Sequence, residues 1–384
     1  MKFINTLPIG VKKENLASYF CSSLFDPKKF LRKSYKDNIN LSIMFLEILE
    51  LYKSPIDDNS PADKNKVKAI FEHLLKNNYL ILYNDHKTNV DSFIHNLYFY
   101  ITQHKVDPKR IYLIVFLPSE VPIIRQKLDE LGLSKIHITY KMNWLLWTKR
   151  HYKPKPETIP IYKFSVFTRR FCDWRLQFYC KLIKHNLLSN TVYTFSNSHP
   201  DFENSIVQKE TMLEHIQGQF SSEVMSKINV WMDSLPVTLK DDTIDPVSDI
   251  IFTKLLESHI HIVCETHVHH SRHGVGLTEK IFKPIVAGKP FVVVGQHNIL
   301  KSLKEQGFRT FHPIIDESYD DIENPQARMD AICCELERIN TLPNNEFNQL
   351  IRNCSDVIQY NLQLVDKYWT EGFPENYKKL NIFG

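Results

Sequence analysis

The sequence predicts an α/β protein with two Rossmann-like domains. Three observations favour this fold class. Apolar runs alternate with amphipathic segments between residues 258 and 316, a less regular alternation occupies residues 79–140, and a proline-rich segment separates the two regions. Strands that alternate with helices of this length are typical of parallel sheets with crossover helices.

The clearest alternation begins with an apolar run at residues 260–264, which predicts a buried strand that ends at Glu265. A polar, histidine-rich loop follows, and Thr278 then begins a helix with one apolar face that Gly288 ends. The next expected elements are a strand at 291–294, a helix that starts near 299 and ends at Gly307, and a short strand at 308–312.

The first half of the chain gives a similar pattern with less regularity. Residues 11–75 are helical by pattern, and residues 42–52 are their clearest amphipathic part. Beyond them we expect strands at 79–85, 111–117 and 136–140, and helices at 93–104 and 121–131. This alternation predicts the second Rossmann-like domain.

Residues 151–160 carry three prolines and no apolar periodicity. Proline is excluded from helix interiors and from central strands, so we expect this segment to be a linker. It would join an N-terminal domain of residues 1–150 to a C-terminal domain of residues 161–342, followed by helices in residues 343–384. A single large sheet, a periplasmic-binding-type pair and a three-domain chain are the alternatives.

After the linker, a strand at 161–167 leads through a basic turn into an amphipathic helix. The turn and the start of the helix carry Arg169, Arg170 and Arg175, whose guanidinium groups suit a diphosphate. The alternative is that these are surface arginines at the start of a helix with no ligand. Further along the chain we expect a strand at 192–198 with Ser196 and Asn197 at its carboxyl end, helical structure at 203–232, and two amphipathic helices at 325–339 and 345–369.

The loop and helix at Gly276, Thr278, Glu279 and Lys280 are the main candidate site. In a doubly wound sheet the loop that leaves a strand lines the ligand crevice, and the next helix offers its N-terminus to an anion. Thr278 suits the N-cap and Glu279 suits the first turn, but the helix dipole repels a cation such as Lys280. A bound phosphate would reverse that repulsion. A solvated lysine on an ordinary helix is the alternative.

The composition favours a globular protein in a reducing compartment. The chain has 384 residues, is 43% hydrophobic and carries 48 Lys and Arg against 44 Asp and Glu, a mild basic excess compatible with an anionic ligand. Its seven cysteines are scattered without C-x-x-C pairs. Neither a signal peptide nor a membrane span is evident, so a cytoplasmic location is expected, with peripheral attachment to the inner face of a membrane as a variant.

Glu265, the run Gly276-Leu277-Thr278-Glu279-Lys280-Ile281-Phe282, Ala287-Gly288 and the strand up to Gly295 resemble the donor-binding segment of bacterial α-1,3-fucosyltransferases. The continuation through Phe311 and residues 314–320 is more similar to a group of bacterial and phage glycosyltransferase-like proteins of the same fold. The resemblance covers roughly the second half of the chain.

This resemblance implies the GT-B architecture, in which two Rossmann-like domains face a central cleft and the last helix crosses back to the N-terminal domain. It implies an inverting, metal-independent transfer from a nucleotide sugar to a saccharide hydroxyl. Lys280, Arg170 and Arg175 would neutralise the leaving diphosphate, and Glu265 and Glu279 would hold sugar or ribose hydroxyls. Arg169, Ser196, Asn197, Gly276 and Thr278 complete the expected donor contacts.

The catalytic base is expected on the N-terminal domain. Asp85, at the end of a predicted strand, is the first candidate, Asp91 is the second, and His86 is an alternative. A base that deprotonates the acceptor hydroxyl contributes about 10²–10⁴ in rate.

Six histidines between residues 259 and 273 raise the hypothesis of a metal site. H-E-x-x-H does not occur, no histidine pair lies at i, i+4 spacing within a predicted helix, and the chain has no Asp-x-Asp, so we expect no metal and no other cofactor. Two further classes of function stay open. One is a phage-type glycosyltransferase that modifies DNA bases, although no basic stripe with interleaved aromatics is evident. The other is a non-catalytic protein that binds a nucleotide or a metal.

Overall fold

The computed structural model describes residues 41–43, 79–84, 94–95, 97–99, 101–102, 105–115, 120–140, 145, 148–149, 151–153, 158–198, 206–239, 249–269 and 275–371. The chain divides into two compact units. The first comprises Met1–Leu146, Arg272–Gly274 and Glu371–Gly384, and the second comprises Trp147–Ser271 and Val275–Thr370. Each unit is an α/β structure with its own parallel sheet, as the sequence predicts.

The first unit contains a four-stranded parallel sheet in the order β1-β2-β3-β4. Its strands are β1 (Leu41–Ile43), β2 (Tyr79–Asn84), β3 (Ile111–Val115) and β4 (His137–Tyr140), with the short 3-10 helix η2 (Pro108–Arg110) before β3 and helix α7 (Glu120–Glu130) between β3 and β4. The predicted strands at 79–85, 111–117 and 136–140 and the helix at 121–131 are confirmed within the described residues. The predicted helix at 42–52 is wrong at residues 42–43, which belong to β1, and its remainder lies outside the described residues.

The second unit contains a four-stranded parallel sheet in the order β6-β5-β7-β8. Its strands are β5 (Tyr162–Phe167), β6 (Thr191–Thr194), β7 (Ser258–Cys264) and β8 (Phe291–Val294). The strand interiors are buried on both faces and mostly apolar, as a sheet covered on both sides requires. Phe164 and Val166 of β5 and Ile260 of β7 are completely buried, and Ile262 is 1% exposed.

The strand order of this sheet reverses between β5 and β7. Helix α9 (Asp173–Lys184) carries the chain from β5 outward to β6, and helix α13 (Glu279–Val286) carries it from β7 in the opposite direction to β8. Crossovers between parallel strands are right-handed, so α9 and α13 cover opposite faces of the sheet. The crevice outside the carboxyl ends of β5 and β7 is therefore a topological switch point, where open α/β sheets bind their ligands.

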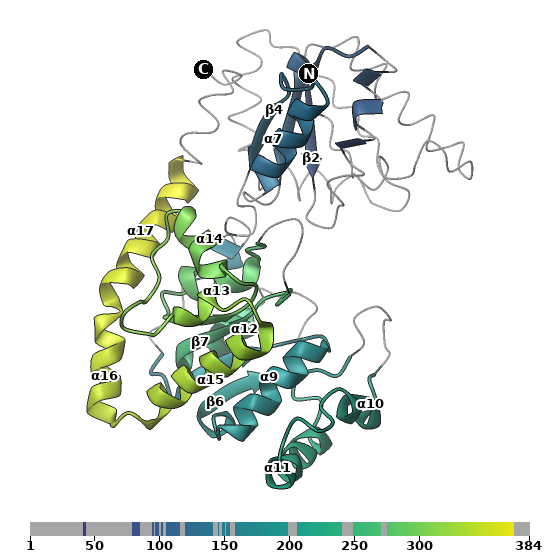
Figure 1. Cartoon of the computed structure of the whole chain (residues 1–384). Helices are drawn as coiled ribbons and strands as arrows, with labels where there is room; N and C mark the ends of the chain where they lie inside the picture. Colours follow the sequence, from purple (N-terminus) through teal and green to yellow (C-terminus); the bar gives the residue numbers. More distant parts are fainter. Residues whose placement is uncertain are drawn as a thin grey trace. The chain divides into compact units, whose positions relative to one another are not determined.

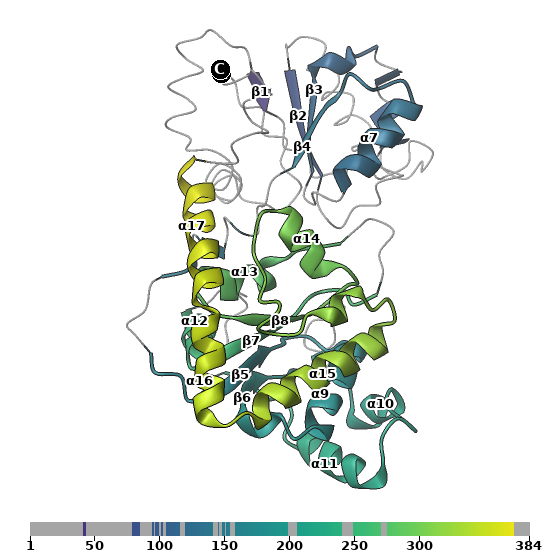
Figure 2. The ribbon, with the colours of Figure 1, turned by 60° about the vertical axis from the view of Figure 1, so that its left-hand side comes forward.

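The remaining helices cover this sheet and its edges (Figures 1 and 2). They are the 3-10 helix η3 (Leu188–Asn190), α10 (Lys209–Glu214), α11 (Ser222–Asp233), α12 (Asp249–Leu256), α14 (Ile299–Glu305), the 3-10 helix η4 (Ser318–Asp321), α15 (Pro325–Thr341), α16 (Asn344–Asn353) and α17 (Ser355–Glu371). Both views show α16 and α17, in yellow, in line along one side of the unit. Within the described residues, no helix combines the length and the apolar character that a membrane span needs.

Three predicted elements differ from the structure. The helical region at 203–232 is divided between α10 and α11, because Gly218 has a φ of +72° and Ser221 caps the start of α11. The second C-terminal helix is split at Cys354 into α16 and α17. The strand at 308–312 is wrong, since this segment pairs with side chains rather than with the sheet.

Those side chains are Asn361 and Glu317. The amide of Asn361, on α17, accepts from the backbone N–H of Arg309 and donates to its carbonyl, both at 2.9 Å. Glu317 accepts from the backbone N–H of Phe311 at 2.6 Å and from the hydroxyl of Thr310 at 2.5 Å. The backbone of the segment therefore has partners without a neighbouring strand, and α17 is tied to the second unit.

The residues of the predicted linker that the structure describes, 151–153 and 158–160, belong to the second unit. The ring of Tyr152 packs edge-on against Phe252 of α12, with the ring centroids 5.0 Å apart. Helices α16 and α17 also belong to that unit up to Thr370, and residues 372–384 lie outside the described part. The predicted domain limits remain a prediction.

Candidate functional site

A cavity of about 1000 Å³ opens at the switch point of the second sheet. Its walls are the whole connection from β5 to α9, residues 167–175, together with the start of α13 and parts of the loop that follows β7. Further lining residues come from the segment around α10 and from α12: Ile206, Val207, Gln208, Thr211, His215 and Ile251. The size is in the range of small-molecule sites.

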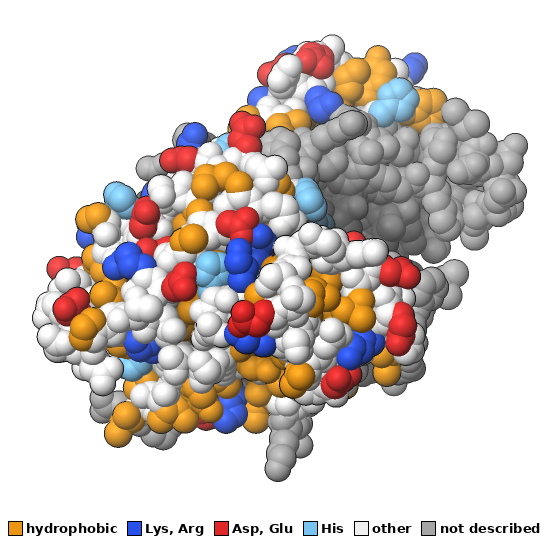
Figure 3. Space-filling view, turned by 60° about the horizontal axis from the view of Figure 1, so that its bottom comes forward, with side chains coloured by type: hydrophobic (Ala, Val, Ile, Leu, Met, Phe, Trp, Pro, Cys, Tyr) orange, Lys and Arg blue, Asp and Glu red, His pale blue; other side chains and the backbone are white. Residues whose placement is uncertain are grey.

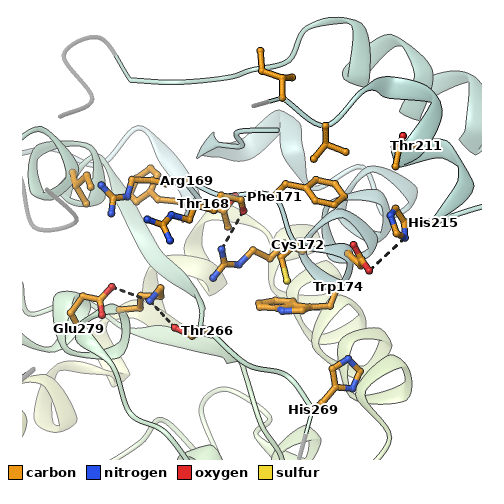
Figure 4. Close-up of a pocket in the computed structure, with 18 of the residues that line it drawn as sticks. Thr168, Arg169, Phe171, Cys172, Trp174, Thr211, His215, Thr266, His269 and Glu279 are labelled. Carbon is orange, nitrogen blue, oxygen red and sulfur yellow. Dashed lines mark hydrogen bonds and ion pairs between the residues drawn. The ribbon is translucent and has the colours of Figure 1, made fainter. Parts of the chain in front are cut away.

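The charged side chains of this cavity are mainly cationic. Arg169, Arg170, Arg175, Lys280 and Lys283 line it, against only two carboxylates, Asp173 and Glu279. Figure 4 shows Arg169 and Glu279 on one side of the cavity and Thr211 and His215 on the other. The positive excess lies beside the first turns of α9 and α13, where the positive ends of the helix dipoles also favour an anion.

Arg175 is the most deeply placed of the arginines, with only 9% of its surface exposed. Its Nη1 donates to the carbonyl of Arg170 at 3.3 Å and its Nη2 donates to the carbonyl of Glu265 at 3.1 Å. These bonds join the connection after β5 to the end of β7. The Nε of Arg175 is buried and has no hydrogen-bond partner in the described part of the chain. An unpaired buried donor costs about 1–3 kcal/mol.

Helix α13 begins at a rigid cap built by Glu265 and Thr278. Thr278 accepts from the backbone N–H of Lys280 at 3.3 Å and donates its hydroxyl to Glu265 at 2.5 Å. Glu265 also accepts from the backbone N–H groups of Thr278 and Thr266, at 3.2 and 3.3 Å. Burial raises the pKa of Glu265, although Lys280 and Thr278 act against that shift. Glu265 is 1% exposed and lies beneath the cavity, where it fixes the geometry of the loop.

Lys280 is held in place by three oxygen atoms. Its Nζ lies 2.9 Å from Glu279 Oε1, 3.1 Å from Thr266 Oγ1 and 3.3 Å from Thr278 Oγ1. Its side chain is 24% exposed, so Lys280 is less open to solvent than a surface lysine.

The carboxylate of Glu279 offsets the repulsion between Lys280 and the helix dipole. Glu279 is itself buried. Burial acts to raise its pKa, but Lys280 and Lys283 together hold the pKa of Glu279 at about 2.

The structure brings together half of the ten predicted donor-binding residues. Arg169, Arg170, Arg175, Glu279 and Lys280 line one cavity. Four other candidates, Gly276, Thr278, Ser196 and Asn197, support loops instead. The backbone N–H of Gly276 donates to Gln296 Oε1 at 2.9 Å, Asn197 Nδ2 donates to the carbonyl of Val207 at 3.3 Å, and the hydroxyl of Ser196 lies 3.0 Å from that of Ser198. The predicted bases, Asp85 and Asp91, and the alternative, His86, lie outside the described residues.

The histidines of residues 259–273 are placed in different environments. His261 is buried between β7 and β5, where its Nδ1 lies 2.8 Å from the hydroxyl of Ser165. Burial lowers the pKa of His261 to about 3, so this ring is neutral. His259 packs edge-on against Phe347, and His269 lines the cavity. The described residues contain no group of three or more potential metal ligands, and residues 270 and 273 lie outside them.

Several lining residues are absent from the sequence-based prediction. Lys283 was missed because its neighbours Ile281, Phe282 and Pro284 are buried and apolar, although its i, i+4 spacing from Glu279 could have drawn attention to it. Trp174 and His215 belong to no sequence motif that would mark them as site residues. His215 Nδ1 lies 3.5 Å from Asp173 Oδ2, an arrangement that depends on the fold of the α10 segment.

No family model matches the chain, and no curated protein matches it. One solved structure similar to it is that of β-glucosyltransferase, a DNA-modifying enzyme determined in the presence and absence of its substrate uridine diphosphoglucose. The identity is 11%, the TM-score is 0.35, and the match covers 80% of this chain and 84% of the other. A TM-score of this size does not establish a shared fold.

Proposed function

We propose that this chain is a glycosyltransferase that binds a nucleotide sugar with its diphosphate in the cationic cavity. One observation carries the proposal: five cationic side chains and the N-termini of α9 and α13 converge on a cavity at the switch point of a parallel sheet. A diphosphate is an anion that such a site suits. The choice of glycosyl transfer rests on the motif resemblance at residues 276–282.

The proposed reaction is a single inverting displacement without a metal ion. An acceptor hydroxyl attacks the anomeric carbon while the bond from that carbon to the diphosphate oxygen breaks. The hydroxyl proton passes to a carboxylate, for which Asp85 and Asp91 remain the candidates, and the diphosphate leaves with the bonding electrons. Arg170, Arg175 and Lys280 stabilise the leaving charge, a preorganised electrostatic effect that is usually the largest single contribution to catalysis.

The structure suggests distinct roles for the two acidic residues of the motif. Both oxygens of Glu265 are engaged by Thr278 and Thr266, so we propose that Glu265 positions the loop and not the sugar. Glu279 is paired with Lys280 and lines the cavity, so it can orient that lysine and accept from a donor hydroxyl. The GT-B arrangement, with the acceptor held by the N-terminal domain, belongs to the same proposal.

Arg170 offers the cleanest test of this site. Its side chain is exposed at the cavity, and only its backbone carbonyl contacts Arg175, so Arg170→Ala should leave the fold intact. The loss of one charge-assisted hydrogen bond, about 1.5–3 kcal/mol, should weaken binding of a nucleoside diphosphate roughly 10- to 100-fold. Calorimetric titration with UDP, GDP and ADP measures this effect.

Arg352→Ala is the matched control, since Arg352 is an exposed arginine on α16 that does not line the cavity. It should bind the same ligand as tightly as the unmodified chain. Equal affinities in the two variants, or no binding of any nucleoside diphosphate to the unmodified chain, would contradict the proposed site.

Turnover assays separate the proposal from its alternatives. Transfer from a radiolabelled nucleotide sugar should reach a saccharide acceptor, whereas a DNA-directed enzyme would label duplex DNA and bind it in a salt-dependent way. A non-catalytic binder would give neither transfer nor hydrolysis. Basic and acidic side chains are interspersed on the described part of the face in Figure 3, which does not favour a nucleic-acid groove on that face.

A further inference from the structure

Lys283 is a buried lysine on the wall of the cationic cavity. It lies one turn after Glu279 on α13, and 7% of its surface is exposed. The carboxylate of Glu279 is already paired with Lys280 at 2.9 Å. Within the described part of the chain, the ammonium group of Lys283 makes no hydrogen bond and no ion pair, although its backbone carbonyl accepts from Ala287 in the helix. A buried ammonium group without such a partner is costly, and a ligand can supply the partner.

The charges that face Lys283 come from three elements. Lys280 and Glu279 lie on its own helix, Arg169 lies in the connection after β5, and Glu265 lies at the end of β7. Burial is the largest effect and lowers the pKa of Lys283 to about 8. Glu279 acts against this shift, whereas Lys280 and Arg169 add to it. The free protein therefore holds this amine close to the point at which it loses its proton.

We infer that Lys283 donates to the phosphate oxygens of the bound nucleoside diphosphate, and that binding of this anion is coupled to proton uptake by the Lys283 amine. This inference rests on the proposed function of the cavity. The proton comes from the solvent and joins the lone pair of the amine, so that the complex contains an ammonium group beside the phosphates. The diphosphate supplies the counter-charge for Lys283, which the neighbouring cations cannot provide.

The sign of the pH dependence follows from the two states of the amine. In the free protein the amine loses its proton as the pH rises through about 8, whereas in the complex the phosphates keep it protonated to higher pH. The affinity for the diphosphate should therefore fall as the pH rises above about 8, by up to roughly tenfold per pH unit. Below that pH the amine is already charged, and little proton uptake is expected.

Isothermal titration calorimetry with UDP and GDP tests the inference between pH 7 and pH 9.5, in pairs of buffers with different ionisation enthalpies. On binding at pH 9, the unmodified chain should take up more protons per ligand than Lys283→Met, by as much as one proton. The Met side chain has a similar length and no charge. Lys283→Arg keeps a charge that does not titrate in this range, so it should bind with no additional proton uptake. The titration of the ligand itself is common to all three proteins and cancels in the comparison.

The outcomes distinguish the inference from the proposed function. Tight binding to the unmodified chain with the same proton uptake in Lys283→Met would overturn the role of Lys283 and leave the cavity as the diphosphate site. Absence of binding to every protein in titrations with UDP, GDP and ADP would overturn both. Thermal melting at pH 7 checks folding, and Lys283→Met should melt no lower than the unmodified chain, because the substitution removes an unpaired buried charge.

Discussion

The pair formed by Glu279 and Lys280 explains how a lysine can occupy the first turn of a helix. The carboxylate of Glu279 lies 2.9 Å from the ammonium group of Lys280, and the positive charge of Lys283 also helps to lower the pKa of Glu279. A single buried anion thus serves two cations on one helix. Both cations, Lys280 and Lys283, line the cavity, so the protonation state of Glu279 affects how strongly they attract an anionic ligand.

Glu279 should make the stability of the chain depend on pH in the acid range. Its pKa falls from 4.5 to about 2 in the folded protein, so it contributes stability above pH 4.5 that is lost as the pH falls towards 2. Glu279→Gln should therefore lower the free energy of unfolding at pH 7, with a smaller difference from the unmodified chain at pH 3. Urea unfolding at both pH values measures this.

The control for this prediction is Glu346→Gln, which makes the same change at an exposed position in the first turn of α16. Its free energy of unfolding should stay close to that of the unmodified chain at both pH values. An equal loss at pH 7 and pH 3 in Glu279→Gln would show that the carboxylate acts by packing and not by charge.

At the scale of elements, two hydrogen bonds from the Asn361 side chain to the backbone of Arg309 replace those that a neighbouring strand would make. Asn361 is 2% exposed and makes two hydrogen bonds to the backbone of one residue. Asn361→Leu would leave both backbone groups without these partners, at a cost of about 2–4 kcal/mol. Thermal melting should show a clear fall in Tm, whereas Asn353→Leu, at an exposed position of α16, should change Tm little.

Sequence patterns located the buried strands well because their signal is local. The apolar runs at β7 and β8 and the glycine after α13 are sufficient to define these elements, and Gly288 has the positive φ of +65° that ends the helix. The segment at 308–312, in which only Phe308 and Phe311 are apolar, is predicted to be a strand but has a different structure. Its partners, Asn361 and Glu317, lie elsewhere in the sequence, and no local pattern reveals them.

The candidate site shows the same division. The cations Arg169, Arg170, Arg175 and Lys280 could be found because they lie at the exit of a strand or at a helix start, where ligands bind. Glu265 has the same sequence position but faces the cap of Thr278, which depends on the path of a long loop. Lys283 becomes a site residue only when α13 is placed against the arginines after β5.

At the scale of the molecule, every residue that lines the cavity belongs to the second of the two compact units. A ligand that fills the cavity should therefore restrict this unit locally. The amides of α9 and α13 that lie nearest the ligand are in their first turns, where the backbone N–H groups have no partner within the helix. Hydrogen exchange reports the opening of such regions residue by residue.

Hydrogen exchange with mass spectrometry on the complete chain, with and without saturating UDP or GDP, should show slower exchange in peptides that cover residues 168–177 and 278–286. Peptides that cover β2 and β3 in the first unit should exchange at the same rate in both samples, since no described residue of that unit lines the cavity. Arg170→Ala should reduce the protection at a ligand concentration that just saturates the unmodified chain. Protection that appears first in β2 or β3 would place the nucleotide on the first unit and contradict the assignment of the cavity.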